Sequence, residues 1–258
     1  MTERTKSIRQ AKARPRYVTT GGELVPGVTT ILSVKAKPAL VGWAFNIGKH
    51  NPELPSIRAY VDDLAEIGTV VHLRVNADLM GTVPDFSDYA PSVVAQSDVS
   101  FEKYLSWKRG RAISLLGAEL SLVSDEHRYG GTLDFFGVID GALTVLDVKT
   151  GKAIYPEYFI QAAAYAQLVV EHFHVTPAEL RILQIGRTGA EGFAERIVSD
   201  FGPYWRAFAA CRALYDADKE IDALAEGPGP HRDNVIDIDA LRGIITRATS
   251  SEQEKNKE

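Results

Sequence analysis

Residues 130–165 constrain the fold more than any other part of this 258-residue chain. They contain two β-rich runs, 133–139 and 143–149, on either side of Asp140 and Gly141. An aspartate–glycine pair between two such runs is typical of a tight β-hairpin turn. The sequence therefore predicts an antiparallel pair of strands here.

Two acids and a lysine converge in this predicted hairpin. Asp147 and Lys149 are two positions apart on one strand and so face the same side. The partner strand can bring Asp134 beside Asp147. Neighbouring carboxylates repel each other, and a hard divalent cation relieves the repulsion by taking oxygen ligands from both. A nearby ammonium can position or deprotonate the attacking water, or stabilise developing negative charge. Such a set suits phosphodiester hydrolysis; an ordinary ion pair on a solvated strand face is the alternative.

Five short motifs occur in a recognisable order: residues 25–32 (V-P-G-V-T-T-I-L), 68–72 (G-T-V-V-H), 131–134 (G-T-L-D), 147–150 (D-V-K-T), and Gln161 with Tyr165. This series resembles the PD-(D/E)XK nuclease superfamily, in the branch that includes the RecB nuclease domain, phage recombination exonucleases and the mitochondrial genome-maintenance exonuclease. The resemblance implies an α/β fold of the restriction-endonuclease-like type, with a mixed central β-sheet flanked by helices.

The resemblance also implies a metal site for Mg²⁺ or Mn²⁺. Its expected ligands are His72, Asp134, Asp147 and the backbone carbonyl of Val148. A lone helical histidine is more often structural, so the assignment of His72 as a ligand rests on the motif. An imidazole nitrogen suits Mn²⁺ better than Mg²⁺. An acid at the position of Glu119 lies near the metal in this family, often through water, and a solvated strand residue is its alternative. The expected catalytic residues are Lys149, Asp134, Asp147, Glu119 and Gln161.

DNA contacts are expected on a helix over residues 156–174. Gln161 and Tyr165 are four apart on it and therefore adjacent on its surface. In the family this helix borders the active site and contacts the nucleic acid strand. The full set of expected DNA contacts is Gln161, Tyr165, Thr150, Lys152, Arg14 and Arg16.

Arg14 and Arg16 belong to a basic segment, residues 1–16, in which Glu3 is the single acid. Such an arm can follow phosphates through charge, although a solubilising disordered tail has the same composition. The net charge of −5 does not indicate a nucleic-acid binder, but local patches decide that property. We expect a flexible arm over 1–16, a single nuclease domain over 17–248, and a disordered tail over 249–258.

Composition excludes several classes of protein. A lone cysteine, Cys211, excludes a disulfide framework and a four-cysteine iron–sulphur cluster. No apolar run reaches the ~20 residues of a membrane span, and the N-terminus lacks a signal-peptide apolar region. We therefore expect a cytoplasmic protein without a membrane partner, in the bacterial host cytoplasm if it is phage-encoded.

The remaining elements follow from periodicity and turn residues. Trp43 and Phe45 are expected in the core, and the strand over 113–123 is expected to turn Leu116, Ala118, Leu120 and Leu122 to one side. The other predictions are a hairpin over 17–25, helices over 28–32, 38–50, 56–80, 92–108, 202–224 and 236–246, and strands over 179–187 and 192–198.

Together these features favour a metal-dependent DNA exonuclease that hydrolyses phosphodiester bonds from DNA ends, with a preference for single-stranded or frayed ends. Its setting would be replication, recombination or repair, with DNA and proteins of those processes as partners. The alternatives are a structure- or sequence-specific endonuclease on the same fold, a non-catalytic DNA-binding module, and a hydrolase of small phosphoesters.

Overall fold

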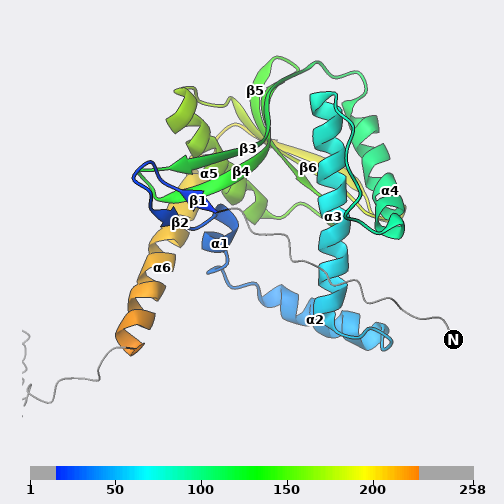
Figure 1. The fold of residues 1–258 in the computed structure, drawn as a ribbon, viewed down its shortest axis with the longest axis horizontal. Helices are drawn as coiled ribbons and strands as arrows, with labels where there is room; N and C mark the ends of the chain where they lie inside the picture. The colour runs from blue at the N-terminus through cyan, green and yellow to red at the C-terminus, as the bar shows by residue number, and fades with distance from the viewer. Residues whose placement is uncertain (1–15, 227–258) are drawn as a thin grey trace, which may run out of the picture. The chain divides into compact units, whose positions relative to one another are not determined.

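A five-stranded mixed sheet forms the centre of the fold (Figure 1). Strands β5 and β6 are parallel, and the other neighbouring pairs are antiparallel. The expected fold class, α/β with a mixed central sheet flanked by helices, is confirmed. In spatial order the strands are β3 (Ile113–Ser124), β4 (Tyr129–Ile139), β5 (Ala142–Lys149), β6 (Glu179–Ile185) and β7 (Phe193–Val198).

The computed structural model describes residues 16–226. Residues 16–215 belong to one unit, and the described residues after Tyr215 continue the last helix. The predicted helix over 236–246, the tail and the arm up to residue 15 lie outside the described residues. The other elements are β1 (Tyr17–Val18), β2 (Leu24–Val25), α1 (Val28–Leu32), α2 (Pro38–His50), α3 (Ile57–Met80), α4 (Pro91–Lys108), α5 (Pro156–Phe173) and α6 (Gly202–Glu226).

Hydrophobic side chains cover both faces of the sheet. One core packs residues of α1, α5 and the start of α6 against the strands, and the other packs α3 and α4 against them. In β5, Val145 belongs to the first core, whereas Leu146 and Val148 belong to the second. Because side chains alternate along a strand, Asp147 and Lys149 face the same side as Val145, the side covered by α5.

The predicted β4–β5 hairpin is present. Its turn residues Asp140 and Gly141 have φ angles of 51° and 90°, and Ile139 pairs with Ala142 on either side of them. Positive φ at both central residues is the conformation for which aspartate–glycine is preferred. The turn therefore fixes the register that aligns the two strands.

Two expectations about the direction of side chains are wrong. Leu116 is 63% exposed, because the β3–β4 register jumps between Leu115 and Gly117 and leaves Leu116 as the extra residue of a β-bulge. Phe45 is 70% exposed. It follows half-buried Trp43 by two positions on α2, about 200° round the helix, and so points away from the side on which Trp43 meets Tyr60 of α3.

Candidate active site

The β4–β5 register brings Asp134 to the end of β5, as the sequence predicts. Phe135 pairs with Leu146, and the backbone N–H of Val148 donates a hydrogen bond of 2.8 Å to Asp134 Oδ2. The other carboxylate oxygen, Oδ1, lies 3.2 Å from Nδ1 of His72 on α3. Asp134 thus connects the hairpin to a helix from a distant part of the sequence.

His72, Glu119 and Asp134 form a group that could hold a metal ion. Each offers a ligand atom, and these atoms lie within 4.8 Å of one another. Glu119 lies opposite Asp134 because the residues beside it on β3 pair with the residues beside Asp134 on β4. Its φ of 48° is unusual for a residue other than glycine, and such strained backbone clusters at functional sites. One imidazole and two carboxylates suit a hard or borderline divalent cation.

Helix α3 approaches the sheet closely beside this group. A Cβ added at Gly68 would lie 3.0 Å from the Oγ1 atom of Thr150, just after β5. Gly68 is one turn before His72, so the missing side chain lets the helix bring the imidazole to Asp134. Gly68 is thus a point of close packing between α3 and the segment after β5.

A chain of polar contacts holds the lysine. The Nζ atom of Lys149 lies 2.7 Å from Asp147 Oδ2 and donates hydrogen bonds to Asp147 Oδ1 at 3.0 Å and Gln161 Oε1 at 3.1 Å. Gln161 Nε2 in turn donates to the Tyr165 hydroxyl at 2.7 Å. The Tyr158 ring centroid is 5.1 Å from Nζ, a cation–π contact. The ammonium is therefore fixed in position from several sides.

Burial shifts the pKa values of this site. Burial raises the pKa of Asp147 to about 6, although the Lys149 ammonium opposes the rise. Burial acts to lower the pKa of Lys149, but the charges of Asp147 and Asp134 together with the Asp147 hydrogen bond outweigh it, and the pKa is raised. For His72, burial again acts to lower the pKa, while the charge and hydrogen bond of Asp134 raise it to about 8. Lys149 therefore carries its proton at neutral pH, and metal-free His72 is largely protonated there.

Asp147 lies outside the group of three potential ligands, with its carboxylate turned to Lys149. Its Oδ2 atom is buried and, among the described residues, receives no hydrogen bond of acceptable geometry. It nevertheless lies within ion-pair distance of the ammonium. An oxygen with unused lone pairs beside a carboxylate–imidazole group is compatible with a cation, so the described side chains fit a divalent metal.

Tyr165 is placed differently from the expected surface position. It is next to Gln161, as predicted, but only 5% exposed. Its ring packs against β4, where a Cβ added at Gly131 would lie 2.5 Å from Tyr165 Cε1. A side chain at residue 131 would therefore push on the Tyr165 ring. Tyr165 positions the Gln161 amide instead of presenting a ring face.

The other expected DNA contacts are spread around the site. Thr150 is half-buried beside Gly68, Lys152 and Arg16 are exposed, and Arg14 lies outside the described residues. Sequence reasoning missed Tyr158, which faces the Lys149 ammonium. Its signal was the spacing of three residues from Gln161, which places both side chains on one face of α5.

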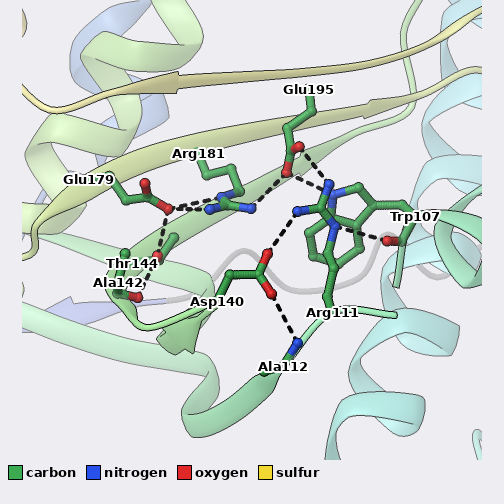
Figure 2. A network of polar contacts seen from close by, with 9 residues as sticks. All are labelled: Trp107, Arg111, Ala112, Asp140, Ala142, Thr144, Glu179, Arg181 and Glu195. Carbon is green, nitrogen blue, oxygen red and sulfur yellow. Dashed lines mark hydrogen bonds and ion pairs between the residues drawn. The ribbon is translucent and has the colours of Figure 1, made fainter. Parts of the chain in front are cut away.

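A second cluster of charges lies near the start of β6 and the β4–β5 turn, whereas Asp147 and Lys149 lie at the end of β5. Figure 2 shows its contacts. Buried Arg181 pairs with Glu179 and with Glu195, the latter at 3.0 Å. Arg111 pairs with Glu195 at 2.8 Å and with Asp140 at 3.0 Å. Because each of the three acids is paired with at least one of the two arginines, the cluster is a structural network that joins β6, β7 and the β4–β5 turn.

No protein-family model and no curated protein matches the sequence. Among solved structures, the chain is similar to a candidate exonuclease from Eubacterium rectale, with 13% identity, a TM-score of 0.43, and coverage of 67% of this chain and 73% of that one. It is also similar to LHK-Exo, an alkaline exonuclease from Laribacter hongkongensis, with 12% identity, a TM-score of 0.30, and coverage of 76% and 92%. A structure of LHK-Exo in complex with dAMP gives 9% identity, a TM-score of 0.35, and coverage of 62% and 86%. Likenesses this distant carry no conclusion about the activity of this chain.

Within residues 16–226, no helix combines the length and apolar character needed to cross a membrane.

Proposed function

We propose that this protein is a metal-dependent deoxyribonuclease that hydrolyses DNA from its ends. The observation that carries the proposal is the juxtaposition of two groups at the end of β5. One is the His72, Glu119 and Asp134 group, which could hold a cation. The other is the fixed ammonium of Lys149. A cation and a positioned ammonium together can stabilise the negative charge that develops during phosphodiester hydrolysis.

His72, Glu119 and Asp134 would hold Mg²⁺ or Mn²⁺, with Asp147 and the Val148 carbonyl as further ligands. The cation, when bound, would supply Lewis acidity to the phosphate and to the attacking water. Asp147 raises the pKa of Lys149, so the side chain stays an ammonium. Lys149, as an ammonium, would orient the attacking water and stabilise charge on the phosphate.

Gln161 and Tyr165 take supporting parts in this proposal. The Gln161 carbonyl holds the Lys149 ammonium, and the Tyr165 hydroxyl fixes the Gln161 amide. Thr150, Lys152 and the basic arm with Arg14 and Arg16 would contact phosphates. The preferred substrates would be single-stranded or frayed ends formed in replication, recombination or repair, including those of a phage.

The test compares linear single-stranded DNA, blunt duplex and closed single-stranded circles, labelled at either end, with Mg²⁺, Mn²⁺ or EDTA. We expect linear single strands to be degraded fastest, circles to resist, and EDTA to stop the reaction. Lys149→Ala is the inactive control. Cleavage of circles as fast as linear strands would show an endonuclease. Failure to cleave any DNA with either metal would reject the nuclease and favour a non-catalytic binding module or a hydrolase of small phosphoesters.

A further inference from the structure

A groove of about 420 Å³ lies between α5 and the segment that follows β2. One wall consists of Glu157, Tyr158 and Gln161 of α5. Tyr158 and Gln161 also contact the Lys149 ammonium. The opposite wall comes from α1, the start of α2 and the segment between them. Its lining residues are Thr29, Leu32, Ser33, Lys35, Lys37 and Leu40.

The groove combines cationic and apolar groups. Lys35 and Lys37 supply ammonium groups, and Tyr158 with the leucines supplies apolar surface. Phosphates are bound by cationic side chains and hydroxyls, whereas sugars and bases pack on aromatic and apolar ones. The volume falls within the roughly 300–1,000 Å³ of ligand pockets. These properties match a nucleotide of a DNA strand better than a purely apolar or purely ionic ligand.

Lys37 already has an anionic partner in the groove. Its Nζ atom lies 3.3 Å from Oε1 of Glu157, and the side chains are 45% and 28% exposed. An ion pair this exposed contributes at most about 1 kcal/mol, so a phosphate can take the place of the carboxylate. Glu157 therefore competes with an anionic ligand for the same ammonium.

We propose that this groove binds the nucleotide next to the scissile phosphodiester, with Lys35 and Lys37 contacting phosphate and Glu157 weakening that contact. The inference rests on the nuclease function proposed above and extends it from the reacting phosphate to its neighbour. It also makes Glu157 a built-in limit on how tightly the strand is held.

The test measures the Kd of a labelled single-stranded oligonucleotide by fluorescence anisotropy in EDTA, which stops cleavage. Lys35→Ala and Lys37→Ala should each raise Kd by up to about fivefold. Each should also reduce the slope of log Kd against log salt by about 0.7, the value for one lost phosphate contact on a single strand. Glu157→Gln should lower Kd. The matched control is Lys49→Ala, which removes an exposed lysine at the other end of α2.

The pair Lys37→Ala and Glu157→Gln separates binding from structure. Both break the same ion pair, so a purely structural role would shift Kd in the same direction, whereas phosphate binding requires opposite shifts. Same-direction shifts, or lysine variants indistinguishable from Lys49→Ala, would overturn the groove assignment. Cleavage by the wild-type protein is assayed in parallel with Mg²⁺ and Mn²⁺. Loss of the groove effect in a protein that cleaves DNA rejects this inference alone, and a wild-type protein without nuclease activity rejects the proposed function.

Discussion

Replacing Asp147 by asparagine should make the metal-free protein more stable while abolishing its activity. Asp147 is almost completely buried, and burial raises its pKa from 3.8 to about 6 even with Lys149 beside it. The folded chain therefore opposes ionisation of this carboxyl more than the unfolded chain does. Asparagine has nearly the shape of the protonated acid and carries no charge, so it removes the cost.

The size of the effect follows from proton linkage. A pKa raised from 3.8 to about 6 corresponds to about 3 kcal/mol, because each pH unit is worth about 1.4 kcal/mol. The cost of ionised Asp147 is absent below pH 3.8, grows as pH rises, and is complete above about 6. For a chain of this size the gain corresponds to an increase in Tm of roughly 6–12 °C.

The assay is thermal and denaturant unfolding in EDTA at pH values above and below this window, with cleavage followed separately in Mg²⁺. Asp147→Asn should exceed the wild type in free energy of unfolding above the window, and the difference should shrink to zero below it. Asp88→Asn, at an exposed position, is the control and should change little. A variant that is less stable than the wild type above the window would refute the burial argument. A variant that cleaves DNA normally would remove Asp147 from the site.

Three further outcomes are expected. Lys149→Ala should lower turnover by roughly a thousandfold, because it removes charge stabilisation of the transition state; single-turnover cleavage measures this loss. The affinity for DNA, measured by fluorescence anisotropy, should stay near that of the wild type. Below a pH of about 8, Asp134 keeps the imidazole of His72 protonated, so cation binding should release a proton from His72. The affinity of the site for the cation should therefore rise with pH up to that value. Calorimetry in buffers of different ionisation enthalpy measures that proton, and its persistence in His72→Ala would contradict the assignment. Gly131→Ala should cost about 1–3 kcal/mol in denaturant unfolding, because its Cβ would lie 2.5 Å from the Tyr165 ring; an unchanged midpoint would contradict that packing.

The sequence predicted the elements whose signals are local. The aspartate–glycine turn fixed the β4–β5 hairpin, and apolar periodicity located the long helix α3. Prediction from the sequence failed where a backbone irregularity or a residue distant in sequence decides whether a side chain is exposed. The bulge at Leu116 has no composition signal, and the exposure of Phe45 depends on which side of α2 meets α3.

The site was predictable to a similar degree. The pairing of Asp134 with the end of β5 follows from hairpin register, and His72 came from a motif. Glu119 was expected only near the metal, yet strand pairing brings its carboxylate into the group with His72 and Asp134. The role of Lys35 and Lys37 could not be predicted from the sequence. They line the groove only because the segment after α1 packs near α5, which is far away in the sequence.

The close approach of Gly68 to Thr150 places α3 beside the strands that carry the other site residues. Asp134 belongs to the hairpin, whereas His72 belongs to α3. Local opening of α3 would withdraw the imidazole and leave the hairpin carboxylate in place. A cation held by His72 and Asp134 would therefore raise the free energy of that opening by mass action, and amide hydrogens around Gly68 would exchange more slowly as the cation concentration rises. The affinity of the proposed metal site would thus also measure how firmly α3 is attached to the sheet.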